Sequence, residues 1–188
     1  MGKIFYDSVQ DNPIIAAIHN VNDLNLAIDT DCEIIFLLTG NIFNLKDVVE
    51  KIKQRGKEVY IHIDLLEGFS RDLVALKYIH ENIRPTGIIT TKSNLIKIAK
   101  EMNMFTIQRL FILDSMALET GINSIHMAKP DAVEILPGIM PKIIKKVYNT
   151  TNIPVIAGGL IQDKEDVIGS LKAGAIGISS SSKNIWNL

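Results

Sequence analysis

Short apolar runs alternate along the chain with amphipathic stretches that are roughly twice as long. Eight such runs occur, at residues 14–18, 33–38, 59–63, 87–90, 106–112, 132–136, 154–158 and 175–179. Most of them carry apolar residues consecutively rather than at alternate positions, which is typical of strands buried on both faces. The pattern therefore predicts eight buried strands.

The stretches between these runs have the period and the end signals of helices. Four of them are clear, at residues 44–56, 93–103, 140–149 and 162–174. Asn44 and Ser93 are predicted N-caps, and Pro141 stands near a first helical position, where its missing N–H costs nothing. Gly56 and Gly174 follow the last helical turns. The sequence thus predicts helices that alternate with strands.

Eight alternating units predict an α/β fold, a compact (β/α)8 TIM-like barrel in which residues 1–188 form a single domain. The chain has 188 residues, whereas such barrels usually run to about 250 and seldom below about 200. Only SSSSKNIWNL remains at the end of the eighth run. We therefore expect a truncated last helix, reduced to a turn near Ile185 and Trp186. A flavodoxin-like open sheet is the alternative, but it would use fewer strands.

Composition narrows the class of protein. The chain is 47% hydrophobic and 22% charged, with a net charge of -1, so no global positive field points to nucleic acid. Cys32 is the only cysteine, so the chain cannot form an internal disulfide. We expect this thiol to be buried, and a single free cysteine fits a cytoplasmic protein. The sequence shows neither a secretory signal nor an apolar run as long as a membrane helix.

Glycine and serine residues follow the last two predicted strands. In a parallel barrel, ligands bind at the carboxyl ends of the strands, and the loops after strands seven and eight often hold phosphate. Glycine allows close approach to the backbone, and serine adds hydroxyl donors. The predicted phosphate ligands are Gly158, Gly159, Gly177, Ser179, Ser180 and Ser181. The alternative is that these residues only make turns.

Polar side chains interrupt or follow other strands. His62 and Asp64 share one face of the third strand. Arg109 and Glu134 interrupt the fifth and sixth strands, which are neighbours in a barrel, so we expect them to pair. The pair could be a satisfied internal ion pair or could also face ligand hydroxyls. No ligand spacing favours a metal, and no residue is assigned a catalytic role.

Several motifs together resemble the glycerol-3-phosphate-responsive antiterminator family, also called glycerol uptake operon antiterminator regulatory proteins. They are HIDLLEG, IQRLFILDSMALE, KPDAVEILPGIMP, IPVIAGGLI and LKAGAIGISSSSKNIW. The resemblance implies a barrel that binds glycerol 3-phosphate, requires no catalysis or cofactor, and acts on the leader mRNA of glycerol-utilisation genes. The polyol would lie against His62, Asp64, Thr91, Arg109, Glu134 and Gly138.

RNA contact has no recognisable module in this sequence. Two basic groups are candidates, and each could equally be a solvated helix face: Lys142, Lys145 and Lys146, and Lys51, Lys53, Arg55 and Lys57. A phosphosugar isomerase or transferase on the same phosphate site is the rival class, and a metabolite-binding barrel without RNA is a third. A homodimer would cover apolar surface that a short last helix leaves next to Trp186.

Overall fold

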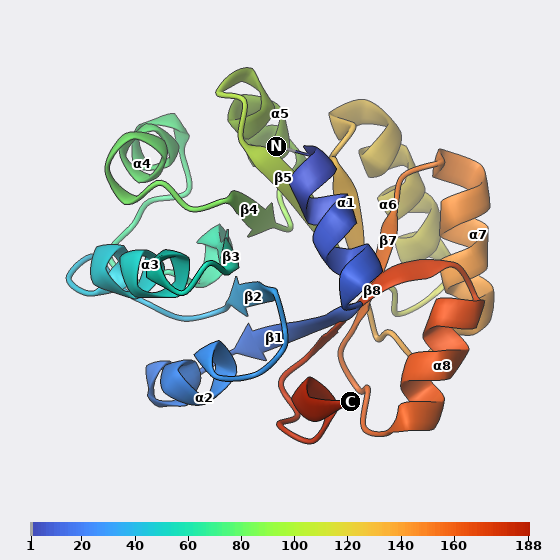
Figure 1. Cartoon of the computed structure of the whole chain (residues 1–188). Helices are drawn as coiled ribbons and strands as arrows, with labels where there is room; N and C mark the ends of the chain where they lie inside the picture. Colours follow the sequence, from blue (N-terminus) through green and yellow to red (C-terminus); the bar gives the residue numbers. More distant parts are fainter. Residues whose placement is uncertain (1) are drawn as a thin grey trace.

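Eight parallel strands close into a barrel in sequence order, and the last strand pairs with the first (Figure 1). The computed structural model describes residues 2–188, with side chains from residue 5 onward. The strands are β1 (Ile14–Ile18), β2 (Ile34–Leu37), β3 (Glu58–His62), β4 (Gly87–Thr90), β5 (Phe105–Phe111), β6 (Ala132–Leu136), β7 (Val155–Gly158) and β8 (Ala175–Ser180). Each predicted run matches its strand to within one residue at either end. The predicted barrel is confirmed, and the open-sheet alternative is wrong because Ile15 of β1 pairs with Ser179 of β8.

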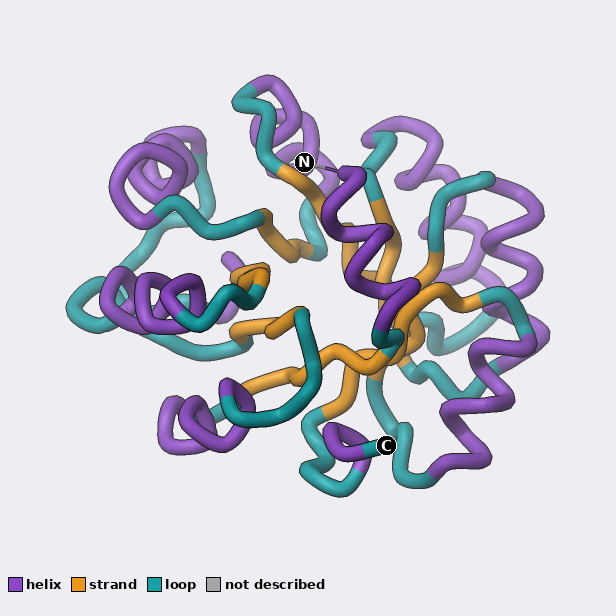
Figure 2. The backbone as a smooth tube through the Cα atoms, viewed as in Figure 1, coloured by secondary structure: helices purple, strands orange, loops and turns teal. Residues whose placement is uncertain are grey.

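Helices surround the strands, as the purple ring around the orange centre of Figure 2 shows. They are α1 (Gly2–Asp11), α2 (Leu24–Ile28), α3 (Leu45–Gln54), α4 (Leu73–Tyr78), α5 (Ser93–Glu101), α6 (Ser115–Ala128), α7 (Pro141–Thr151) and α8 (Lys164–Lys172). Short turns η1 (Val21–Asp23), η2 (Ile63–Leu65) and η3 (Ile79–Ile83) extend or precede some of them. After β8 the described chain has only the 3₁₀ turn η4 (Ile185–Asn187), so the truncated last helix is confirmed.

The predicted helix ends are mostly right. Pro141 opens α7, and Gly56 and Gly174 take positive φ angles of 76° and 105° after α3 and α8. Of the two predicted N-caps, Asn44 does lie at the N-cap position of α3 but makes no capping hydrogen bond, and Ser93 is wrong. The Asn44 side chain accepts from the N–H of Asn41 in the preceding loop instead of capping α3. Ser93 is already the first residue of α5, because the helix begins one position earlier than the cap prediction requires.

Apolar side chains fill the barrel interior in addition to the layer between strands and helices. The interior holds large side chains such as Phe36, Tyr60 and Phe105. Helix α1 lies across the amino ends of the strands (Figure 1) and inserts Phe5, which is 0% exposed. The Phe5 ring lies 5.3 Å from Tyr60 and 4.7 Å from Phe105 between centroids. This end of the barrel is therefore closed by packing.

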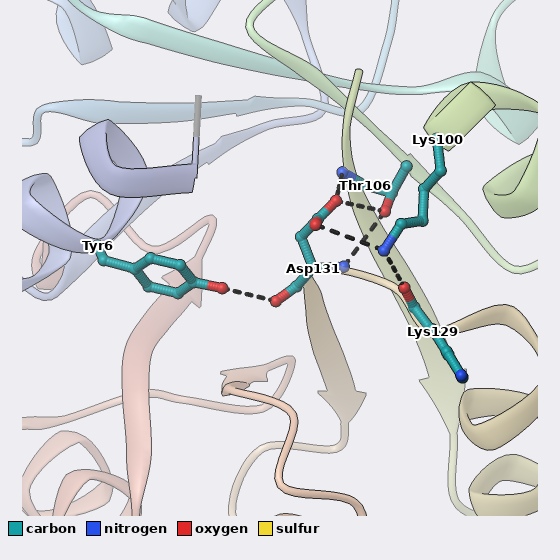
Figure 3. A network of polar contacts seen from close by, with 5 residues as sticks. All are labelled: Tyr6, Lys100, Thr106, Lys129 and Asp131. Carbon is teal, nitrogen blue, oxygen red and sulfur yellow. Dashed lines mark hydrogen bonds and ion pairs between the residues drawn. The ribbon is translucent and has the colours of Figure 1, made fainter. Parts of the chain in front are cut away.

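Hydrogen bonds reinforce the closure by α1. Glu58 accepts from the hydroxyls of Ser8 and Tyr60, each at 2.6 Å. The Tyr6 hydroxyl donates to the backbone carbonyl of Asp131 at 2.7 Å. Figure 3 shows that Asp131 also accepts from Thr106, at 2.9 Å from its N–H and 2.7 Å from its hydroxyl, and pairs with Lys100. The first helix is thus joined to the amino ends of β5 and β6.

The turn η4 closes the side of the barrel between β8 and β1. Trp186 is 2% exposed, and its indole N–H donates to the carbonyl of Ser180 at 2.6 Å. Cys32 lies beneath it, and burial raises the pKa of its thiol. The buried indole thus packs against this side of the barrel in place of the truncated last helix. Among the described residues, no helix is long and apolar enough to cross a membrane.

Candidate functional site

A cavity of about 320 Å³ opens at the carboxyl ends of the strands. Its size is at the small end of the range of ligand pockets in proteins. The residues that line it come from β1, β2, β5, β6, β7 and β8 and the loops that follow: Ala17, His19, Leu38, Arg109, Glu134, Leu136, Gly159, Leu160, Ile161, Gln162, Ser179, Ser180, Ser181 and Ser182. The loops after strands seven and eight thus meet in one cavity, as predicted.

The end of β7 and the loop that follows it combine a close backbone approach with an unfavourable backbone conformation. A Cβ at Gly158, the last residue of β7, would lie 2.5 Å from Oε1 of Glu134, so a larger residue would displace the Glu134 carboxylate. Gly159 and Leu160 both take positive φ angles, 74° and 60°, a conformation that is unfavourable for leucine. Residues of a tight turn of this kind can direct successive N–H groups to one point, as in an anion-binding nest.

The end of β8 divides its serines between two roles. The Ser180 hydroxyl donates to the carbonyl of Ile161 at 3.3 Å and accepts from the N–H of Ser182 at 3.1 Å, which ties the two loops together. By contrast, the hydroxyls of Ser179, Ser181 and Ser182 make no hydrogen bond within the described part of the chain. Those three hydroxyls line the cavity and can donate to a ligand.

Arg109 and Glu134 form the predicted pair. They lie opposite each other in the register of β5 and β6, and Nε of Arg109 lies 2.6 Å from Oε2 of Glu134. The side chains are only 6% and 1% exposed. Among residues 2–188, this is the one hydrogen bond of the Arg109 side chain. Both residues line the cavity, so the terminal guanidinium nitrogens are left for a ligand.

Two histidines near Arg109 are held in the neutral form. Partial burial and the charge of Arg109 lower the pKa of His19, which lines the cavity. Burial, and then Arg109, lower the pKa of His62 to about 4. His62 is 2% exposed, and its Nδ1 has no partner within the described residues. Among the residues that line the cavity, the positive charge at neutral pH is therefore that of Arg109.

Asp64 organises the loop after β4 and does not line the cavity. It accepts from the Thr90 hydroxyl at 2.9 Å and from the N–H and hydroxyl of Thr91 at 2.7 and 2.8 Å. Burial alone would raise the pKa of Asp64, but these hydrogen bonds outweigh it and hold the pKa below its usual value. The polar groups of the Asp64 and Thr91 side chains are thus already paired with each other.

Gly138 and Gly177 lie away from the cavity, contrary to the sequence prediction. Gly138 packs behind the β7 loop: its N–H donates to the carbonyl of Gly159 at 3.0 Å, and its carbonyl accepts from Ser170. A Cβ on Gly177 would meet Ile15 and Val9 near α1, so this glycine lies toward the closed end. His62 does not line the cavity either. Sequence reasoning had missed Gln162, Ser182 and Leu136, which carry no signal beyond their place next to the glycines and serines.

A larger groove, about 580 Å³, lies between α3 and η3. Its lining includes Gln54 and Arg84, which precede β3 and β4, so it faces the amino ends of the strands, where barrels seldom bind ligands. Lys46 and Glu50 pair along α3 at 3.9 Å, and both are more than half exposed. It offers no buried polar group and is the weaker candidate. Within residues 2–188, no three His, Cys, Asp or Glu side chains are grouped to hold a metal ion.

Comparison with known proteins places the chain among regulators. The sequence profile described as "Glycerol-3-phosphate responsive antiterminator" matches residues 14–186. The chain is 39% identical over 180 residues to the uncharacterized protein YgcP of Escherichia coli (strain K12), covering 96% of this chain and 94% of that protein.

Solved structures agree with this result. The glycerol uptake operon antiterminator regulatory protein of Listeria monocytogenes has a TM-score of 0.91 and 38% identity, covering 94% of this chain and 95% of that one. A glycerol uptake operon antiterminator-related protein of Thermotoga maritima has a TM-score of 0.83 and 33% identity, covering 92% and 96%. The deoxyribose phosphate aldolase of Aeropyrum pernix, at 16% identity, a TM-score of 0.69 and coverage of 98% and 95%, shares only the fold. The chain therefore belongs to the glycerol-3-phosphate-responsive antiterminator family.

Proposed function

We propose that the protein binds glycerol 3-phosphate in the cavity at the carboxyl ends of the strands and that the liganded form acts on leader mRNA in the cytoplasm. The observation that carries the ligand half is the meeting of the strained β7 loop with the free serine hydroxyls beside Arg109. The observation that carries the RNA half is membership of an antiterminator family. A homodimer remains a prediction.

Charge within the cavity orients the ligand. The Glu134 carboxylate would repel a phosphate placed beside it, whereas hydroxyls can donate to its oxygens. The phosphate therefore belongs at the other side, between Gly159 and the hydroxyls of Ser181 and Ser182. The glycerol hydroxyls then face Glu134 and the terminal nitrogens of Arg109. From the predicted set we retain Gly158, which makes room for Glu134, as a residue that shapes the site.

The cavity fits an aldolase-like activity less well than it fits ligand binding. Schiff-base chemistry needs a lysine directed at the substrate. None of the eight strands contains a lysine, and none lines the cavity. The family and its two solved relatives are described as antiterminators, which agrees with a regulator rather than an enzyme.

Calorimetric titration with glycerol 3-phosphate, glycerol and inorganic phosphate tests the proposal. We expect wild type to bind glycerol 3-phosphate more tightly than either fragment. Gly159→Asp should abolish binding by placing a negative charge next to the phosphate. Gly159→Asn carries the same strain at φ 74° without the charge, so it should retain more of the affinity. Equal loss in both variants, or no loss in either, would contradict phosphate binding at this loop.

A further inference from the structure

The two groups of basic side chains differ in whether their charges are already engaged. The four residues around the end of α3 all contact acceptors in the protein. These contacts are Lys51 with Asn25 Oδ1 at 2.6 Å, Lys53 with the Arg84 carbonyl at 2.9 Å, Arg55 with Asp29 at 3.5 Å, and Lys57 with the carbonyls of Thr30 and Cys32 at 2.6 and 2.7 Å. This group stabilises the packing of α3 and is a poor candidate for binding a partner.

The lysines of α7 are free. Lys142, Lys145 and Lys146 are exposed, and they lie three and four positions apart on the helix face opposite the buried Ile144 and Val147. Within residues 5–188, none of the three side-chain ammonium groups makes an ion pair or a hydrogen bond. Residues 135–162 contain no aspartate or glutamate. The outer face of α7 is therefore a positive surface with no compensating charge on its own segment.

An aromatic ring borders these lysines. Tyr148 is 42% exposed and follows Lys145 by three positions on the same helix. Lysines that neutralise phosphates beside an aromatic ring on which a base can stack are the combination that binds nucleic-acid strands. We propose that the outer face of α7, formed by Lys142, Lys145, Lys146 and Tyr148, is the surface that contacts RNA. This inference rests on the proposed function.

The position of α7 gives this surface a connection to the ligand cavity. The helix joins β6 to β7, and the residues at both of those strand ends, Leu136 and Gly159, line the cavity. The N–H of Gly138, between β6 and α7, donates to the carbonyl of Gly159 at 3.0 Å. The Gly138 carbonyl accepts from Ser170 of α8 at 2.9 Å. A ligand that fixes the β7 loop would therefore also fix the start of α7. Its effect on RNA affinity can be no larger than the difference between its own affinities for the two arrangements.

The test compares two variants that remove the same charge. One is Lys142→Gln/Lys145→Gln/Lys146→Gln, and its matched control is Lys51→Gln/Lys53→Gln/Arg55→Gln. The probe is a fluorescently labelled leader transcript of a glycerol-utilisation operon from the same genome. RNA affinity is measured by anisotropy with and without glycerol 3-phosphate at several salt concentrations. Calorimetry with glycerol 3-phosphate shows for each variant that the cavity is intact.

We expect the α7 variant to lose RNA affinity by at least about tenfold, with a slope of log K against log salt that is smaller by about 2, because three phosphate contacts disappear. Replacing the three lysines with arginine should keep the affinity. The control variant should bind RNA like wild type. Normal RNA binding by the α7 variant, or equal losses in both variants, would overturn the α7 surface while leaving the proposed function standing. A wild type that binds glycerol 3-phosphate but no RNA would overturn both.

Discussion

The two ends of the barrel use their polar and aromatic residues in opposite ways. At the amino ends of the strands, α1 closes the barrel with Phe5, and Glu58 receives hydrogen bonds from both Ser8 and Tyr60. At the carboxyl ends a cavity remains, and three serine hydroxyls together with the terminal nitrogens of Arg109 have no partner within the described chain.

Several strongly exposed apolar side chains also lie at the carboxyl end. The loops and first helical turns at the carboxyl end carry Phe43, Leu113, Met116 and Leu160, which are 91%, 85%, 75% and 61% exposed. Phe5 at the other end is fully buried. The comparison indicates that one end supplies stability and the other keeps unsatisfied groups for binding, the division expected of barrel proteins.

Replacing Phe5 gives the largest expected change in stability. Phe5→Ala would leave a cavity among the rings of Tyr60 and Phe105 and should lower the free energy of unfolding by about 4 kcal/mol. The affinity for glycerol 3-phosphate should stay within about twofold of wild type, since the ligand site is at the other end. Denaturant unfolding and calorimetry measure the two quantities.

The control is Phe43→Ala. Phe43 is 91% exposed, so its loss should change stability by less than about 0.5 kcal/mol. A large loss of ligand affinity in Phe5→Ala, measured under conditions where that variant is folded, would show that the two ends are coupled rather than separate.

The Arg109–Glu134 pair tests whether the open end also needs its charges for stability. Arg109→Gln leaves the Glu134 carboxylate, which is 1% exposed, without its partner and should lower the free energy of unfolding by about 3 kcal/mol. Binding of glycerol 3-phosphate should be lost as well. The double variant Arg109→Gln/Glu134→Gln removes both charges and should regain most of the stability but not the binding. If the double variant binds the ligand like wild type, the pair is only an internal ion pair.

His62 gives the smallest of these changes, and it depends on pH. The unfolded imidazole takes up a proton near pH 6.5, whereas burial and Arg109 lower the pKa of His62 in the fold to about 4. The stability contributed by neutral His62 is therefore present above pH 6.5 and falls as pH drops toward 4. Wild type should lose about 2 kcal/mol from this residue between pH 7 and 4.5.

His62→Gln should flatten that decline in unfolding free energy. His126→Gln, on an exposed position of α6, is the control and should keep the wild-type decline. An unchanged pH dependence in His62→Gln would mean that His62 takes up its proton at the same pH in the folded protein as in the unfolded chain, contrary to its burial beside Arg109.

How far the sequence predicts the molecule depends on the range of the interactions involved. Strands and most helix ends follow from local pattern, because consecutive apolar residues and residues such as Pro141 and Gly174 act within a few positions. The Arg109–Glu134 pair was also predictable, since neighbouring strands in a barrel bring their interior residues together. Family resemblance supplied the antiterminator function, which no residue chemistry alone would have given.

Other features depend on three-dimensional packing, which the local sequence pattern does not predict. Gly138 and Gly177 have the same local signal as Gly159, yet one packs behind a loop and the other faces α1. Asp64 lies at the same end of the barrel as the ligand site, but its carboxylate already accepts hydrogen bonds from Thr90 and Thr91. The closure of the barrel by α1 depends on contacts between residues far apart in sequence, such as Tyr6 with Asp131.

The crystal structure of the protein with glycerol 3-phosphate tests the central claim most directly. The account predicts phosphate oxygens within hydrogen-bond distance of backbone N–H groups of the Gly159 loop and of the hydroxyls of Ser181 or Ser182. It also predicts glycerol hydroxyls next to Arg109 and Glu134. Phosphate bound instead in the groove by Lys53 and Arg84, or a ligand whose phosphate lies beside Glu134, would contradict the account.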